Sequence, residues 1–163
     1  RRVAPGAGGG LLSLAGARPE ALPAAGGPRL RREAEARLPT RFGEFRVVAY
    51  RDAADGRAHL ALVAGEVRGR GRVFAHIHRS CLLGEAFGSL GCGCGALLEG
   101  AMQRAQREGR GVIAYVARGG GASASGAGCP KDGESACAVG AAIFEDLGLR
   151  SVRLLPVGEV LGS

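Results

Sequence analysis

The chain has 163 residues, 46% of them hydrophobic, and a formal net charge of +7. This length favours one domain with a proper core over two. Most of the positive charge falls in residues 1–32, which hold six Arg and one Glu, so the rest is nearly neutral. Scattered aromatic residues, five Phe and two Tyr, offer no stacking platform for nucleic acid, and no apolar run approaches the ~20 residues of a membrane span. We therefore expect neither nucleic acid nor a membrane as a partner.

Residues 1–31 are rich in Gly, Ala, Pro and Arg and show no sustained periodicity. This composition predicts a disordered leader or linker. Because the chain starts at Arg1 rather than Met, we expect it to be part of a longer product. Five cysteines, three of them clustered, argue against a disulfide framework and favour a reducing compartment. We expect a cytoplasmic location, or a plastid location if the Arg-rich leader is a transit remnant.

After Phe42 the composition of the sequence changes to runs of apolar residues. A β-branched and aromatic run at 45–50 and an apolar run at 58–63 flank a turn cluster at 52–56, which predicts a hairpin. A third strand is predicted at 73–78, and it would deliver Cys81 just beyond its end.

Apolar residues recur at helical spacing over 96–108, and Gly109 should end this helix. A short buried strand is expected at 112–116, followed by a Gly-rich loop at 118–129. Val139 to Leu147 indicate a second helix, and 152–155 a closing strand. The sequence thus predicts an α/β fold: a mixed sheet with helices packed on it, strand-rich in its N-terminal half.

Cys81, Cys92 and Cys94 have the spacing C-x10-C-x-C. Two cysteines one residue apart in a Gly-rich turn can aim at one point, and a third can join them from a strand end. Zinc favours sulfur at tetrahedral angles, and three protein ligands leave a fourth position open for water. The alternative is that these cysteines are small buried hydrophobic residues.

The stretch 76–95, H-I-H-R-S-C-L-L-G-E-A-F-G-S-L-G-C-G-C-G, and the later G-R-G-V-I-A-Y resemble the GTP cyclohydrolase II family of riboflavin biosynthesis. The resemblance extends from about Arg32 to Leu155, so we assign residues 32–163 to this domain. It implies Zn²⁺ on the three cysteines, GTP as substrate with Mg²⁺, and a homodimer. The implied reaction opens the guanine imidazole ring by hydrolysis and releases formate and pyrophosphate. In bifunctional relatives the domain follows a dihydroxybutanone-phosphate synthase, and the chain near Arg32 resembles that junction.

The resemblance also implies a nucleotide-binding segment just before the first cysteine. The family pattern R-V-H-S-E corresponds here to His76, Ile77, His78, Arg79 and Ser80, of which His78 matches. The residues alone leave other roles open. The two histidines face the same side of a strand, so either could be a fourth metal ligand, a proton shuttle or simply a hydrogen-bonded strand residue.

Several family residues are missing. In the segment after Tyr115 the family's glutamate and arginine fall on Gly119 and Gly121, with Gly120 retained as a nucleotide-binding candidate. The implied general base and the nucleophilic arginine fall on Gly133 and Ser135. Asp132 is one residue out of register and is a weak catalytic candidate or part of a solvated turn.

Activity is therefore expected to be impaired or lost. The alternatives are a non-catalytic, zinc-stabilised domain that binds a protein partner, or a fragment without a stable fold. Cys129 and Cys137 match no family ligand, and we interpret them as free residues or as a second metal pair.

Overall fold

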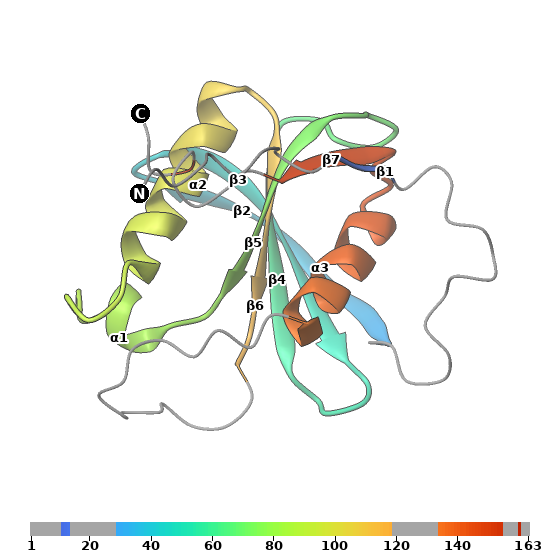
Figure 1. Ribbon diagram of the computed structural model, residues 1–163. Coiled ribbons are helices and arrows are strands. Elements are labelled where there is room, and N and C mark those ends of the chain that lie inside the picture. The colour runs from blue at the N-terminus through green and yellow to red at the C-terminus, as the bar shows by residue number, and fades with distance from the viewer. Residues whose placement is uncertain (1–10, 14–28, 119–133, 155–159, 161–163) are drawn as a thin grey trace, which may run out of the picture.

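A computed structural model describes residues 11–13, 29–118, 134–154 and 160. Its strands form one mixed sheet in the order β1-β7-β5-β6-β4-β3-β2, with helices on both faces (Figure 1). The α/β fold expected from the sequence is thus confirmed. The elements are β1 Leu11–Ser13, β2 Leu30–Thr40, β3 Gly43–Asp52, β4 Ala58–Ala64, β5 Val73–Arg79, α1 Leu82–Glu85, α2 Cys94–Arg107, β6 Gly111–Val116, α3 Glu134–Asp146 and β7 Ser151–Leu154.

The predicted hairpin is confirmed as the antiparallel pair β3 and β4, in which Tyr50 lies opposite His59. The long strand β2 was not predicted. It pairs with β3 at one edge of the sheet, and its side chains are almost all exposed. Charged residues, Pro39 and a bulge next to Arg32 fit an edge strand that avoids pairing with other chains. Because both faces meet solvent, no hydrophobic alternation revealed it.

Strand β1 falls inside the range predicted as a leader and pairs antiparallel with β7. Apart from Leu11–Ser13, residues 1–28 lie outside the described part of the chain. The disordered leader therefore stays a prediction, as does its boundary with residues 32–163.

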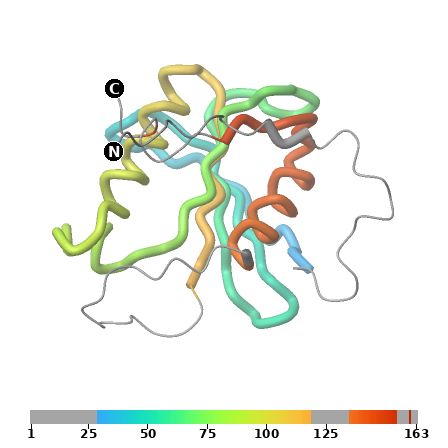
Figure 2. The backbone as a smooth tube through the Cα atoms, viewed as in Figure 1, coloured from blue at the N-terminus to red at the C-terminus, as the bar shows by residue number. Residues whose placement is uncertain are grey.

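Strands β5, β6 and β7 run parallel in the middle of the sheet, and each connection between them contains a helix. Helices α2 and α3 pack on opposite faces (Figure 2). Alternate residues of β6 serve both layers: Val112 and Ala114 join the core under α3, whereas Ile113 joins the core under α2. A strand buried on both faces is continuously apolar, as V-I-A-Y-V suggested.

Both main helices are present where the sequence predicts them, and α2 matches its predicted bounds closely. Helix α2 begins two residues before the predicted start, and Gly109 ends it with a φ of 65°. Helix α3 begins at Glu134, earlier than the apolar pattern indicated, and Gly148 follows it with a φ of 72°. Within the described ranges no helix is both long and apolar enough to cross a bilayer.

Gly111 lets α2 lie directly on the start of β6. A Cβ atom there would be 2.7 Å from the Cβ of Ala105 and 3.0 Å from Cδ1 of Phe74. We expect Gly111→Ala to lower the free energy of unfolding by about 1–3 kcal/mol, because the buried layer has no room to move. Denaturant unfolding in the presence of a chelator measures this. The matched control is Gly93→Ala, at a site with nothing within 4 Å, and equal stabilities of the two variants would contradict the prediction.

Candidate metal centre

The three clustered cysteines lie beyond the carboxyl ends of the parallel strands β5 and β6. Cys81 follows β5, while Cys92 and Cys94 lead into α2. The strand ends are tied together beneath them: the Ser80 amide donates to the carbonyl of Val116, and the Arg118 amide donates to Oγ of Ser80 at 3.0 Å. This is the edge of an α/β sheet at which ligands usually bind.

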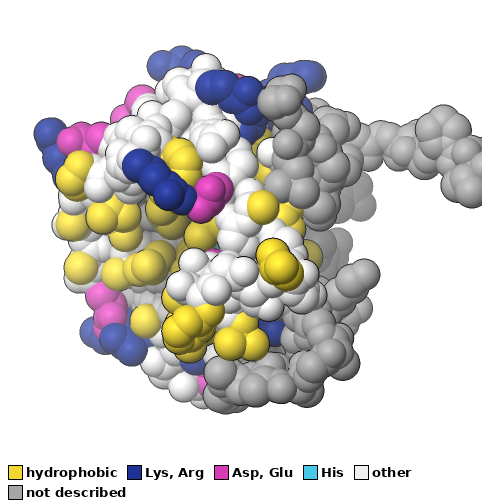
Figure 3. Space-filling view, turned by 90° about the vertical axis from the view of Figure 1, so that its left-hand side faces the viewer, with side chains coloured by type: hydrophobic (Ala, Val, Ile, Leu, Met, Phe, Trp, Pro, Cys, Tyr) yellow, Lys and Arg dark blue, Asp and Glu magenta, His cyan; other side chains and the backbone are white. Residues whose placement is uncertain are grey.

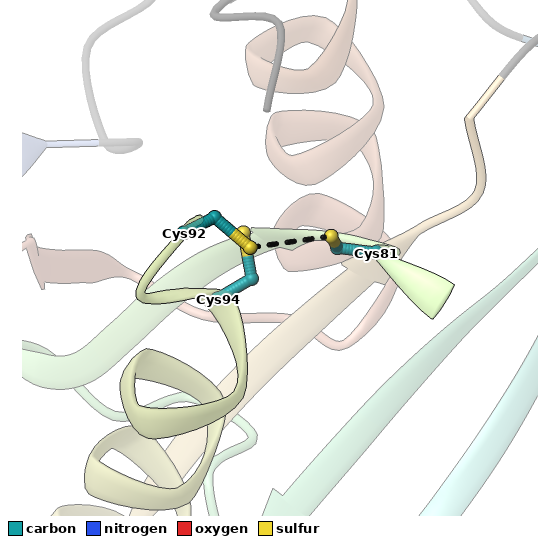
Figure 4. Close-up of side chains that lie close together, drawn as sticks. All are labelled: Cys81, Cys92 and Cys94. Atoms are coloured by element: carbon teal, nitrogen blue, oxygen red, sulfur yellow. Dashed lines mark hydrogen bonds between the residues drawn. The ribbon is translucent and has the colours of Figure 1, made fainter. Parts of the chain in front are cut away.

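The sulfur atoms of the three cysteines point toward one another (Figure 4). The Sγ atoms of Cys81 and Cys92 are 3.7 Å apart, and all three sulfurs lie within 4.8 Å of one another. Two thiolates on one tetrahedral zinc, each at ~2.3 Å, would be roughly 3.8 Å apart. A disulfide needs about 2.05 Å, so these are free thiols with the spacing of metal ligands. The convergence predicted from C-x10-C-x-C is therefore present in the fold.

The backbone around the sulfurs is shaped to leave room for them. Gly84 in α1 carries no side chain, and a Cβ there would lie 2.7 Å from Sγ of Cys92 and 3.4 Å from Sγ of Cys81. Gly95 is equally constrained, because its Cβ would lie 2.5 Å from the carbonyl oxygen of Gly84. The two glycines let α1 and the start of α2 approach until their cysteines share one point.

Helix starts face the same cluster. Cys81 caps α1, and its sulfur accepts a bond from the Gly84 amide at 3.4 Å. Cys94 is the first residue of α2, whose cap Gly93 makes no side-chain bond. Three converging sulfurs and a backbone that leaves room for them together fit a zinc ion.

Glu85 is the residue that sequence reasoning missed. Its Oε1 accepts from the Cys81 amide at 2.6 Å and lies 2.9 Å from Nε2 of His78, while Oε2 accepts from the Tyr115 hydroxyl at 2.6 Å. The carboxylate therefore fixes the first cysteine, the histidine and the tyrosine at once. An acidic residue four positions after Cys81 resembles the returning half of a capping box, which was the only available signal.

The two strand histidines face the same side, as predicted, with ring centroids 5.7 Å apart. His78 is 4% exposed, is held by Glu85 and stacks on Tyr115. Burial and the bond to Glu85 raise the pKa of the Tyr115 hydroxyl. Neither histidine belongs to the sulfur cluster, which is the one group of possible metal ligands among the described residues. The described structure therefore does not support His76 or His78 as a fourth metal ligand.

His76 is different because its Nε2 is buried without a hydrogen-bond partner among the described residues. Burial, with a smaller effect of His78, lowers its pKa to about 4. The imidazole is therefore neutral at neutral pH, and its buried Nε2 is left without a partner among the described residues.

The other predicted site residues are spread around this edge or lie outside the described part. Ile77 faces the opposite side and packs against Gly140 of α3, so its side chain belongs to the core. Arg79 and Ser80 are half-buried at the end of β5. Ser135 and the free Cys137 are exposed in the first turns of α3. Gly119, Gly120, Gly121, Cys129, Asp132 and Gly133 lie outside the described residues.

We predict that Gly84→Ala weakens zinc binding at least tenfold, because its Cβ would displace the sulfur of Cys92. A competition titration with a chromophoric chelator measures the affinity. Gly91→Ala is the matched control, since its Cβ meets only Oγ of Ser89 at an ordinary 3.4 Å. Equal affinities of wild type and Gly84→Ala would show that the sulfurs do not share one ion.

His76 should make the metal-free fold sensitive to acid. Its pKa is about 4 in the folded chain and 6.5 in the unfolded chain, so the unfolded state binds more protons between these values. Stability contributed by the neutral ring is complete above pH 6.5 and is lost as pH falls toward 4, by up to about 3 kcal/mol. We expect His76→Gln to flatten this part of the pH dependence in denaturant unfolding. Parallel curves for the two proteins would contradict the assignment.

The chain is similar to known proteins over most of its described residues. The family model for GTP cyclohydrolase II matches residues 31–157. The GTP cyclohydrolase-2 of Proteus mirabilis is 49% identical over 87 residues, covering 53% of this chain and 44% of that protein. The riboflavin biosynthesis protein RibBA of Mycobacterium ulcerans is 38% identical over 153 residues, covering 77% of this chain and 36% of that protein.

A solved structure shares the fold. It is RibBX, a two domain 3,4-dihydroxy-2-butanone 4-phosphate synthase from A. baumannii, with a TM-score of 0.55, 22% identity, and coverage of 78% of this chain and 34% of that one. The chain spans less than half the length of these relatives. With a family model matched over most of its residues and the cysteine motif gathered at one point, the chain belongs to the GTP cyclohydrolase II family.

Proposed function

We propose that the chain binds one Zn²⁺ through Cys81, Cys92 and Cys94 and is a GTP cyclohydrolase II-type domain with impaired activity. The observation that carries the proposal is the convergence of three sulfurs within 4.8 Å at the ligand-binding edge of the sheet. The substrate class is GTP with Mg²⁺, and the reaction is the opening of the guanine imidazole ring with loss of formate and pyrophosphate. The cluster requires reduced thiols, which supports the cytoplasm as its compartment.

A zinc ion in this place would supply an activated water at neutral pH. Hydrogen bonds of Glu85 fix the residues around this position. Glu85 holds the Cys81 backbone, and with it the direction of the first sulfur. The same carboxylate keeps His78 and Tyr115 in one fixed, stacked arrangement beside the centre.

His76 is the residue of this segment whose side chain has a ring nitrogen without a hydrogen-bond partner among the described residues. Its neutral ring carries an unpartnered but buried Nε2, which a base or hydroxyl of a nucleotide would reach only if the neighbouring side chains move. The proposed nucleotide-binding set is otherwise His78, Arg79, Ser80 and Gly120, with Ile77 contributing through its backbone. Ser80 takes part in the bond to the Arg118 amide, so this segment is tied to the chain that leaves β6.

Impairment is proposed because the family's proton-transfer and phosphoryl positions carry other residues. The aspartate position falls on Gly133 and the arginine position on Ser135, neither of which can replace the original group. Ser135 is exposed at the start of α3. Asp132 remains a weak candidate for the base.

Metal content tests the centre directly. We expect about one zinc per chain by elemental analysis of wild type, and none in Cys92→Ser/Cys94→Ser, because two sulfurs are lost. Cys137→Ser is the matched control, since this free cysteine is exposed and lies outside the cluster. Equal zinc in all three proteins would refute the proposed ligands.

Turnover tests the impairment. Protein supplied with GTP, Zn²⁺ and Mg²⁺ should release formate far below the ordinary enzymatic rate of about 10 s⁻¹. Formate is measured by a coupled dehydrogenase assay, with the Cys92→Ser/Cys94→Ser protein as a blank. Release at an ordinary rate would refute impairment while leaving family membership intact.

A non-catalytic, zinc-stabilised binding domain is the second candidate, and one observation favours it. Large apolar side chains are exposed around the centre: Leu82 at 56%, Phe87 at 74% and Leu90 at 102%. In the space-filling view, hydrophobic side chains cover much of the left and lower parts of this face (Figure 3). Such a patch is typical of a protein-binding surface, and the homodimer is proposed for the same reason. A chelator that lowers the melting temperature of a protein without measurable GTP affinity would favour this candidate over the cyclohydrolase.

A further inference from the structure

A polar cavity lies at the opposite end of β5 from the cysteines. It has a volume of about 220 Å³ and is lined by Arg72, Val73, Phe74, Glu108 and Arg110. Six residue steps along β5, at ~3.3 Å each, place it roughly 20 Å from the metal centre. It therefore cannot be an extension of the site described above.

Two arginines of this cavity have unused binding capacity. The side chains of Arg72 and Arg110 make no ion pair or hydrogen bond with another described residue, and both residues are exposed. They are not neutralised by the one carboxylate of the cavity. Both oxygens of Glu108 accept from Arg153 at 2.7 Å, and Oε1 also accepts from Nε of Arg104 at 2.5 Å.

The saturation of Glu108 has an electrostatic consequence. Partial burial would raise its pKa, but the bonds from Arg153 and Arg104 outweigh this effect and lower the pKa. The carboxylate is therefore ionised and is already bound by Arg153 and Arg104, so it does not balance the charges of Arg72 and Arg110. The cavity carries an excess of positive charge that an anion would balance.

The rim of the cavity is fixed by backbone bonds rather than left loose. Arg72 has a φ of 55°, which is uncommon for a residue other than glycine, and its amide donates to Oγ of Ser151 at 2.8 Å. The Arg150 amide donates to the carbonyl of Arg70 at 2.8 Å, and the Gly69 amide donates to the carbonyl of Gly148. A backbone held in a strained conformation by its neighbours often marks a functional position.

Further arginines surround this end. Arg68 and Arg70 lie on the same loop as Arg72, and Arg107 ends α2. In the space-filling view, dark blue side chains stand out at the top of the molecule, the end at which β5 starts (Figures 1 and 3). Such a field would steer anions toward the cavity.

We propose that this cavity is an anion site for a phosphoryl group, carried by a small phosphorylated molecule or by free phosphate. Two guanidinium groups match the charge of a phosphate dianion, and arginine donors suit its oxygens. A carboxylate monoanion would leave one of the two charges unbalanced. The volume accommodates more than a bare phosphoryl group, which admits a small organic phosphate.

The test is a titration of the ¹⁵N-labelled full chain with inorganic phosphate at constant ionic strength, followed by amide shifts in the NMR spectrum. We expect saturable shifts centred on Arg72, Gly111 and Ser151. In Arg72→Asn/Arg110→Gln the apparent Kd should rise at least tenfold, because both guanidinium groups are lost. Asn at position 72 keeps a side chain that tolerates the left-handed backbone, so the loop is preserved.

Arg37→Gln is the matched control, because it removes the same charge from the edge strand β2, where the Arg37 side chain is 84% exposed. Its affinity should equal that of wild type. Parallel titrations distinguish the sources: tighter binding of ribose 5-phosphate indicates an organic phosphate, and equal or tighter binding of inorganic phosphate indicates the free anion. Acetate binding as tight as phosphate would overturn the proposal. Shifts that do not saturate, or that are unchanged in the double variant, would do so as well.

Discussion

The candidate site depends on bringing three sulfur atoms within 4.8 Å of one another, close enough to share one ion. The segments that carry Cys81 and Cys92 are eleven residues apart and must meet. Two glycines allow this contact: Gly84 leaves the space that the sulfurs fill, and Gly95 lets α2 approach the carbonyl oxygen of Gly84. A single methyl group at either position would push the two segments apart, so the cysteines can converge only because both residues lack a side chain.

The sheet holds this centre rigidly because the same elements serve the core and the site. Strand β5 is buried between two helical layers and ends at Arg79, two residues before Cys81. Helix α2 starts at Cys94 and packs Ala101 and Ala105 into the core about two and three turns later. Glu85 then links the cysteine loop to Tyr115 on β6. Loss of packing in the core would therefore also displace the ligands.

The sequence predicts those parts of the fold and site whose signal lies within a short stretch of chain. The hairpin, the helix that ends at Gly109 and the aim of the three cysteines all follow from patterns within about twenty residues. Strand β2 was missed because its charged residues meet solvent on both faces. Glu85 was missed because its partners Tyr115 and His78 are distant in sequence or hidden in a strand. The arginine cavity depends on β5, β6 and α2 meeting, which no single stretch encodes.

The most direct test of the central claim is X-ray absorption at the zinc edge on the purified, zinc-loaded chain. The predicted spectrum contains three sulfur neighbours at ~2.3 Å and one lighter oxygen or nitrogen neighbour at ~2.0–2.1 Å. Three sulfurs would establish that Cys81, Cys92 and Cys94 bind one ion together and leave its fourth position to a small ligand. A shell of oxygen and nitrogen alone, or one with a single sulfur, would contradict this.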